Sequence, residues 1–188
     1  MSSARPSNLI QDPDKLLRKL GLHFRNPALI RQALTHRSAH ADNNERLEFL
    51  GDSVLGFVIA ERLYQKFGDA DEGVLSRLRA TLVNQTALAN IARKLSLGDY
   101  LILGSGELKS GGYRRDSILS DAMEALIGAL YLDQGYGTAR DFIGKQLFHK
   151  TDDVVARRLW QDAKSRFQEV AQEKEGITPS YQLIDRSG

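Results

Sequence analysis

The chain has 188 residues, of which 41% are hydrophobic, 27% are charged and 4 are proline, a composition that excludes a disordered or collagen-like chain. Its 26 basic and 24 acidic residues leave a net charge of +2, which by itself indicates no partner. The chain has no cysteine, which excludes disulfides, thiolate zinc sites and a cysteine nucleophile, and its four histidines lack the spacing of paired metal ligands. A metal site would therefore use oxygen ligands, which favours magnesium or manganese.

The first residues have neither the apolar run nor the cleavage pattern of a signal peptide, and no stretch approaches the ~20 apolar residues of a membrane span. We therefore expect a cytoplasmic protein that does not contact membranes. From residue 12 to about residue 150, apolar residues recur every three to four positions, which predicts an all-α body. The breaks between its helices are expected at Gly21, Asn26-Pro27, 38–44, 68–73, Gly98, 104–112 and 135–137.

The helix predicted from residue 44 onward carries three carboxylates on one face. Glu45, Glu48 and Asp52 are spaced i, i+3 and i+7, which places them within an arc of about 60°. An acidic face in contact with solvent is the ordinary interpretation. The apolar run that follows instead predicts a helix buried on every side. Gly51 and Gly56 each cost about 1 kcal/mol relative to alanine inside a helix, which suggests that another backbone comes close.

The stretch 104–117 is glycine-rich, and we predict that it is an irregular functional loop rather than a helix. It contains Lys109, Arg114 and Arg115, whose side chains can reach phosphates while the glycines expose backbone N–H groups. The alternative is a flexible loop in contact only with solvent.

A second helix, predicted over 116–132, repeats the carboxylate pattern with Asp121 and Glu124 at i and i+3. Small residues at 125 and 128 lie near them and would let a partner helix approach. If the two helices pack together, Glu48, Asp52, Asp121 and Glu124 converge in a largely buried pocket. Four close carboxylates repel, so that either their pKa values rise or a divalent cation binds. Carboxylate-bound magnesium favours hydrolysis of a phosphodiester, with one or two ions per site left open.

The chain changes character after Trp160, where one amphipathic helix and one strand-like run over 180–184 are predicted. These two elements bury too little to fold alone. They are therefore either part of a second domain or an element that docks on the first.

Several motifs resemble those of the ribonuclease III family, in family order and spacing from about Lys15 to Leu147. They read LTHRS at 34–38, NERLEFLGDS at 44–53, DEG at 71–73, LSRLRA at 75–80, GELKSGGYRR at 106–115 and SILSDAMEA at 117–125. The resemblance implies a helical endonuclease domain that cuts double-stranded RNA as a homodimer. It also implies magnesium, with manganese able to substitute, no small-molecule cofactor, and products with a 5′ phosphate, a 3′ hydroxyl and short 3′ overhangs. The expected substrates are ribosomal RNA precursors and structured messenger RNAs, and a role in transfer RNA processing is also expected.

Matched position by position, the resemblance assigns metal binding to Glu48, Asp121 and Glu124, and catalytic roles to Asp52 and Glu124. Asp52 would orient water, and Glu124 would be indispensable to the chemistry. Two further acids match positions at the subunit junction that help to place the substrate; these are Glu45 and Glu72. His36, in the first motif, is interpreted as a structural residue without chemistry.

The last residues resemble the start of a double-stranded RNA-binding domain, whose Gln168 and Glu169 would reach minor-groove 2′-hydroxyls. The predicted organisation is a catalytic domain over 12–150, a linker over 151–161 and an incomplete α+β domain over 162–188, with its first helix and first strand only. Two other functions are alternatives to the nuclease. One is a catalytically silent scaffold that binds duplex RNA, which would be expected to have lost one of the four carboxylates. The other is a helical phosphohydrolase of small nucleotides, which would be expected to have clustered histidines.

Overall fold

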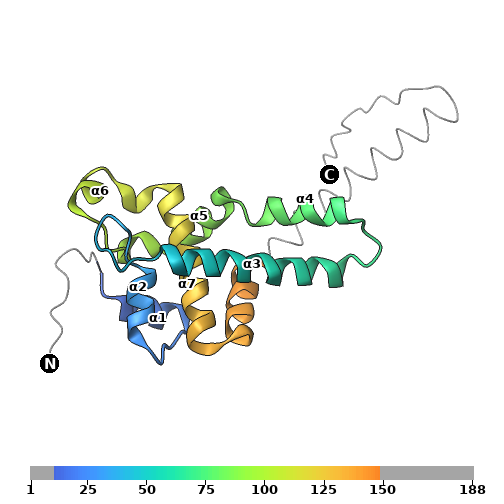
Figure 1. Ribbon diagram of the computed structural model, residues 1–188, viewed down its shortest axis with the longest axis horizontal. Coiled ribbons are helices and arrows are strands. Elements are labelled where there is room, and N and C mark those ends of the chain that lie inside the picture. Colours follow the sequence, from blue (N-terminus) through green and yellow to red (C-terminus); the bar gives the residue numbers. More distant parts are fainter. Residues whose placement is uncertain (1–10, 149–188) are drawn as a thin grey trace, which may run out of the picture. The chain divides into compact units, whose positions relative to one another are not determined.

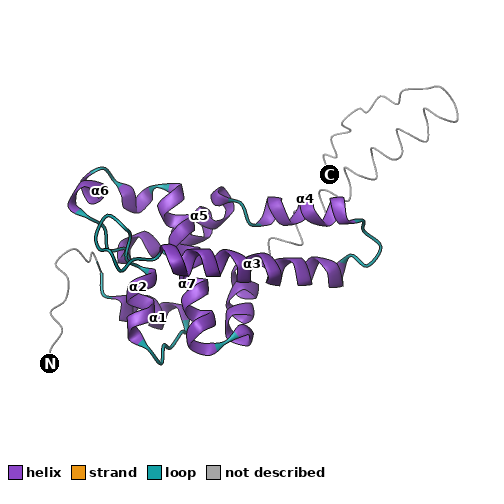
Figure 2. Ribbon diagram, viewed as in Figure 1, coloured by secondary structure: helices purple, strands orange, loops and turns teal. Residues whose placement is uncertain are grey.

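The computed structural model describes residues 11–148, all within one compact unit (Figure 1). Helices joined by loops make up this part of the chain, with one isolated parallel bridge between Thr35 and Ile102 and no other strand pairing among the described residues (Figure 2). The prediction of an all-α body is confirmed. None of the helices in this described part is long and apolar enough to cross a membrane. The elements are α1 (Pro13–Leu20), α2 (Pro27–Ala33), α3 (Glu45–Lys66), α4 (Glu72–Leu82), α5 (Gln85–Lys94), η1 (Leu97–Tyr100), α6 (Ser105–Lys109), η2 (Gly112–Arg114) and α7 (Asp116–Gln134), followed by helical residues at 136–148.

Several helices begin where a short polar side chain satisfies an otherwise free backbone N–H group. The side chains of Asp12, Asn26, Asp71 and Asn84 accept such bonds at the starts of α1, α2, α4 and α5. Proline occupies the first helical position of both α1 and α2, where no hydrogen bond is lost. Gly21, with φ of 65°, ends α1 in the left-handed conformation that favours glycine. The chemistry of these residues therefore accounts for the starts of α1, α2, α4 and α5 and for the end of α1.

The core forms where α3 crosses α7, and the two backbones touch at this crossing. A methyl group on Gly51 would overlap the carbonyl oxygen of Glu124, and one on Gly128 would overlap the carbonyl oxygen of Leu47. The predicted close approach at Gly51 is therefore confirmed. At Gly56 it is wrong, because no atom of another element lies within 4 Å of the position a methyl group would take. The crossing holds the first turns of α3 beside the acidic face of α7.

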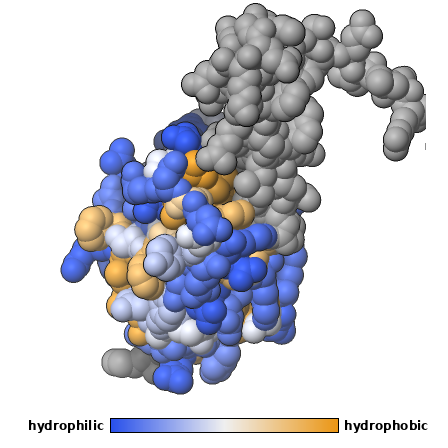
Figure 3. Space-filling view, turned by 90° about the vertical axis from the view of Figure 1, so that its right-hand side faces the viewer, coloured by the Kyte–Doolittle hydropathy of each residue, from blue (hydrophilic) through white to orange (hydrophobic). Residues whose placement is uncertain are grey.

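The second half of α3 lies alongside α4, and together they extend away from α1 and α2 (Figure 1). The prediction that α3 is buried on every side is wrong within one chain, because Phe49, Phe57 and Tyr64 are 77%, 60% and 74% exposed. Figure 3, which faces the α3–α4 end, shows apolar groups at the surface among hydrophilic ones. Helical periodicity separates apolar from polar faces, but it does not reveal whether the same chain covers the apolar face.

The stretch 104–117 was expected to be irregular, and this prediction is wrong. It forms the short helix α6 and the single turn η2, and α7 begins at Asp116. The reason is where the glycines fall. Gly104 precedes α6, while Gly111, with φ of 75°, lies between α6 and η2, so only Gly106 is inside α6. Glycines at helix ends favour turns without preventing the helix between them.

Candidate metal centre

Three carboxylates meet where α3 crosses α7. Glu48 of α3 and Asp121 and Glu124 of α7 each offer an oxygen, and these oxygens all lie within 4.8 Å of one another. The i, i+3 spacing puts Asp121 and Glu124 on one face of α7, and the glycine contact of the crossing brings Glu48 to that face. All three side chains are half-buried. The arrangement matches a site for one hard divalent cation.

The pKa values of all three carboxyl groups are raised. Burial is the largest cause for Glu124, whose pKa rises to about 8, and the charges of Asp52, Glu48 and Asp121 add to it. Burial also raises the pKa of Glu48, helped by the surrounding acids. Burial raises the pKa of Asp121 as well, although a hydrogen bond from the Ser120 hydroxyl (3.3 Å) partly opposes this. The centre therefore binds protons strongly when no cation compensates its charge.

Asp52 lies beside the three-carboxylate group rather than within it. Its side chain is exposed, yet among the neighbouring charges it does the most to raise the pKa of Glu124. The expected convergence of four acids in a largely buried pocket is therefore only partly met: three gather, the fourth lies at their edge, and the site is half-buried.

The residues at this site fit a bound cation. Within residues 11–148, no Lys, Arg or His side chain forms a hydrogen bond or ion pair with Glu48, Asp121 or Glu124, so their negative charge has no direct partner. Oxygen-only donors of this kind suit magnesium or manganese better than softer metals.

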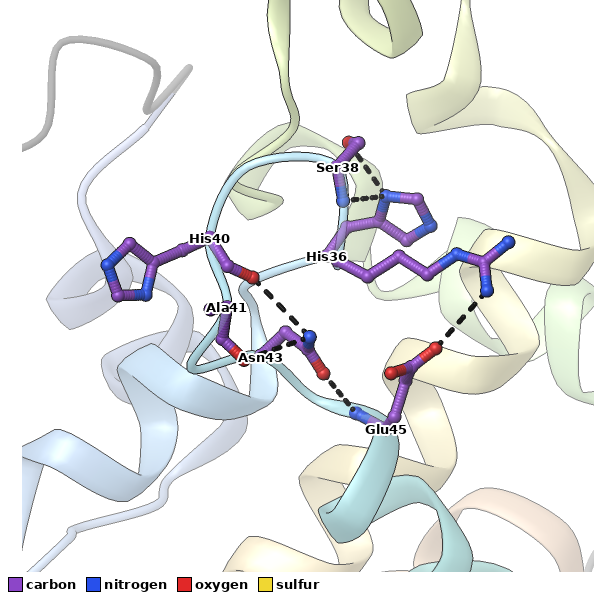
Figure 4. Close-up of polar contacts among 7 residues, drawn as sticks. His36, Ser38, His40, Ala41, Asn43 and Glu45 are labelled. Atoms are coloured by element: carbon purple, nitrogen blue, oxygen red, sulfur yellow. Dashed lines mark hydrogen bonds and ion pairs between the residues drawn. The ribbon is translucent and has the colours of Figure 1, made fainter.

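A loop over 35–44 leads into α3 beside the centre (Figure 4). The charges of His36 and Arg37 on this loop lower the pKa of Asp121, which places both residues near the carboxylates. Arg37 is also paired with Glu45, at 3.4 Å. The sequence interpretation gave this loop no chemistry. The loop lies beside the centre because it leads directly into α3, and the bridge between Thr35 and Ile102, which no local pattern predicts, anchors its first residue.

The two acids assigned to a subunit junction lie apart in the described chain. Glu45, exposed, is in the first turn of α3. Glu72 begins α4, where it accepts a hydrogen bond from the Ser76 hydroxyl at 2.7 Å. Glu72 lines a pocket with Phe57 and Tyr64, which lie about 14 and 24 Å along α3 from Glu48 at 1.5 Å per residue. One chain therefore does not bring Glu72 to the metal centre.

That pocket lies between the second half of α3 and α4 and has a volume of about 500 Å³. Its walls are mostly apolar, with charged groups among them. The lining residues are Phe57, Ala60, Glu61, Leu63, Tyr64, Glu72, Leu75, Ser76 and Arg79.

The predicted phosphate-binding residues occupy the region of α6 and η2. Lys109 ends α6, and the guanidinium of Arg114 stacks on the ring of Tyr113 at 5.0 Å. Arg115 differs from both, because Glu107 holds its guanidinium at 3.0 Å. Lys109 and Arg114 form no ion pair with another residue of the described segment. Gln168 and Glu169, with the helix and strand predicted around them, lie outside the described residues.

Comparison with known proteins identifies what this chain resembles. A family model described as Ribonuclease-III-like matches residues 26–151. The protein named ribonuclease 3 from Methylococcus capsulatus is 61% identical over 181 residues, which are 96% of this chain and 78% of that protein. Ribonuclease 3 from Nitrosococcus oceani is 52% identical over 177 residues, covering 93% of this chain and 76% of that protein.

Solved structures give the same result. The nuclease domain of ribonuclease III from Campylobacter jejuni, studied for flexibility in a region involved in dimer formation, has a TM-score of 0.69 and 45% identity. The match covers 72% of this chain and 98% of that one. Dicer from Pichia stipitis shares the fold, with a TM-score of 0.54 and 22% identity over 88% of this chain and 64% of that one.

Proposed function

This chain belongs to the ribonuclease III family, and from that premise we propose that it is a magnesium-dependent endonuclease that hydrolyses double-stranded RNA. The observation that carries the proposal is the cluster of Glu48, Asp121 and Glu124, whose oxygens lie within 4.8 Å of one another. A cation held there would polarise a phosphoryl oxygen and lower the pKa of a coordinated water. Manganese would substitute for magnesium, since both accept the same oxygen ligands.

The protein's residues divide the work in this proposal. Glu48, Asp121 and Glu124 hold the cation, and their half-buried position limits competition from bulk water. Asp52, exposed at the edge, orients the attacking water and receives a hydrogen bond from it. Glu124 contacts both helices of the centre, because its backbone carbonyl packs against α3. The charges of the other three acids all raise the pKa of its side chain.

Family membership supports the remaining features of the reaction. We infer 5′-phosphate and 3′-hydroxyl ends with short 3′ overhangs, made in the cytoplasm on ribosomal RNA precursors and structured messenger RNAs and in transfer RNA processing. Lys109 and Arg114 are the best-placed phosphate contacts because neither is engaged in an ion pair with the described residues, whereas Arg115 is held by Glu107. The organisation into a catalytic domain over 12–150, a linker over 151–161 and the start of an RNA-binding domain over 162–188, with Gln168 and Glu169, belongs to the same proposal.

A homodimer is the second part of the proposal. Phe49, Phe57 and Tyr64 expose aromatic surface along α3, and a monomer rarely leaves a patch of this kind uncovered. A two-fold partner would cover this face on both chains through one self-complementary contact. Such an arrangement also accounts for the positions of Glu45 and Glu72. Glu72 does not reach the metal centre of its own chain, so it can approach only the centre of the partner chain. The duplex would then contact both centres, one for each strand.

Retention of all four acids supports catalysis over the alternative of a silent scaffold that binds duplex RNA. The test is incubation with matched double-stranded RNA, single-stranded RNA and double-stranded DNA, each with and without magnesium. We expect endonucleolytic products from the RNA duplex alone, and only when magnesium is present. Binding of the RNA duplex without cleavage would favour the scaffold, and cleavage of all three substrates would reject specificity for double-stranded RNA.

The dimer is tested by Phe49→Asp, with Leu132→Asp as the matched control because Leu132 is 54% exposed on a different helix, α7. Burial of an aromatic side chain contributes about 1.5–3 kcal/mol, and a two-fold interface contains each contact twice. We therefore expect the dissociation constant of the Phe49 variant to rise by at least about 100-fold in analytical ultracentrifugation. An unchanged constant, or an equal rise in the Leu132 variant, would reject this face as the interface.

A further inference from the structure

The loop over 35–44 carries two histidines whose rings lie on opposite sides of it (Figure 4). The Nδ1 atom of His36 faces back into the loop, where it accepts a hydrogen bond from the backbone N–H of Ser38 at 3.2 Å and lies 2.8 Å from the Ser38 Oγ. That Oγ already accepts the N–H of Gly104 at 2.9 Å, so its own hydrogen is available to Nδ1. An Nδ1 that accepts hydrogen bonds places the ring proton of a neutral histidine on Nε2.

The ring of His36 is also held on a rigid base. The backbone N–H of His36 donates to the carbonyl of Ile102 at 3.0 Å, and Thr35 forms the bridge to the same residue. Gly104 packs so closely on the loop that a methyl group there would overlap the carbonyl of Ser38. The position of the ring is thus set by backbone contacts with the segment 102–104. A donor held in this way loses little entropy when it binds a ligand.

His36 lies near the carboxylates without bonding to them. It is half-buried, and its neighbour Arg37 is paired at 3.4 Å with Glu45, which lies about one turn before Glu48 on α3. No hydrogen bond joins His36 to Asp121 within the part of the chain that the structure describes, although His36 also acts on that side chain electrostatically. Carboxylates can only accept hydrogen bonds from water or bind cations, so the centre itself offers nothing that donates to a phosphate oxygen. The Nε2–H of His36 is a donor on the loop that leads into α3 beside the centre.

We propose that His36 is a catalytic residue, whose Nε2–H donates a hydrogen bond to a nonbridging oxygen of the reacting RNA phosphate at the centre formed by Glu48, Asp121 and Glu124. Ser38 is its positioning residue. This inference rests on the proposed function. A preorganised donor beside the reacting phosphate stabilises the charge that develops there.

The test uses variants that separate the two ring nitrogens. The amide nitrogen of a glutamine can reach the position of Nε2, whereas that of an asparagine reaches only the position of Nδ1. The control is His40→Asn, because His40 lies in the same loop and its Nδ1 also accepts a backbone N–H, from Asp42 at 3.0 Å, while its ring is on the other side (Figure 4). For each protein one measures kcat and KM on an RNA duplex, the half-saturating magnesium concentration, and the thermal unfolding midpoint.

We expect His36→Asn to lower kcat by about 10- to 100-fold, the range for loss of one preorganised donor, with KM and the half-saturating magnesium concentration unchanged. His36→Gln should recover to within about threefold of wild type, and His40→Asn should match wild type. If His36→Asn does not fold, His36→Ala with added imidazole replaces it. Recovery by imidazole then supports the role, and its absence overturns it.

Three results overturn the inference while the wild-type protein cuts duplex RNA: an unchanged kcat in His36→Asn, a His36→Gln variant as slow as His36→Asn, or a loss that excess magnesium restores. The last would mean that His36 acts on cation binding through Asp121 and not on RNA. Failure of the wild-type protein itself to cut duplex RNA in magnesium would instead reject the proposed function, and this inference with it.

Discussion

Binding of a divalent cation to the RNA-free protein should release a proton from Glu124. Burial and the neighbouring acids raise the pKa of this carboxyl group to about 8. At pH 7 a group with that pKa is about 90% protonated, and at pH 9 about 10%. A carboxylate must lose its proton to bind a cation, so binding should release about 0.9 proton from Glu124 at pH 7 and about 0.1 at pH 9. The apparent affinity should rise about tenfold per pH unit below 8 and level off above it.

Isothermal titration calorimetry with manganese measures this release directly. Titrations at pH 7 in buffers with different heats of ionisation give the number of protons released from the slope of the observed heat. Glu124→Gln is the control, because it keeps the shape of the side chain and removes its proton. We expect the slope to fall sharply in this variant, leaving only the smaller release from Glu48 and Asp121. Heats independent of the buffer at pH 7, together with an affinity that is constant between pH 6 and 9, would refute the placement of Glu124 in the metal centre.

Three further predictions follow from the same structure. Glu124 holds a proton in the native state that it releases in the unfolded state, so the free energy of unfolding of the cation-free protein should fall as pH rises from 4.5 to 8. After allowance for solvent screening of this half-buried group, the expected fall is about 2 kcal/mol. Chemical denaturation should show this fall, and magnesium should reverse it. Gly51→Ala should lower the thermal unfolding midpoint by several degrees, since its methyl group would overlap the Glu124 carbonyl, whereas Gly106→Ala, with open space around it, should not; equal midpoints would contradict the backbone contact. The double variant Lys109→Ala, Arg114→Ala should bind duplex RNA with a shallower slope of log affinity against log salt concentration, reduced by about one to two. An unchanged slope in a gel-shift series over salt concentration would exclude both residues from phosphate contact.

The carboxylate centre could be predicted from the sequence because its parts are periodic. The i, i+3 spacing of Asp121 and Glu124 defines one face of α7, and Gly51 opposite Gly128 signals that two backbones meet. Helical periodicity and the costs of glycine are local properties, and the crossing of α3 with α7 depends on little else.

Other features depend on contacts that local sequence does not encode. The apolar run in α3 predicted full burial, yet Phe57 is 60% exposed, because periodicity does not tell a face covered by the same chain from one available to a partner. The glycine content of 104–117 predicts an irregular loop, yet only Gly106 falls inside α6, because the other glycines lie before that helix or at the start of η2.

The role proposed for His36 depends on an even longer-range contact. A lone histidine in a loop is ordinarily a structural residue, and the fixed position of this one depends on the contacts of Thr35 and His36 with the distant residue Ile102.

The central claim is that the cluster containing Glu124 carries out hydrolysis rather than RNA binding. The most direct measurement compares wild type and Glu124→Ala on one long RNA duplex, with cleavage measured in magnesium and binding in calcium. We expect cleavage by the variant to fall by at least about 1,000-fold while its affinity for the duplex stays within about twofold, because the ligand is lost but the RNA-binding surface is intact. Cleavage at the wild-type rate by a highly purified variant would contradict the account.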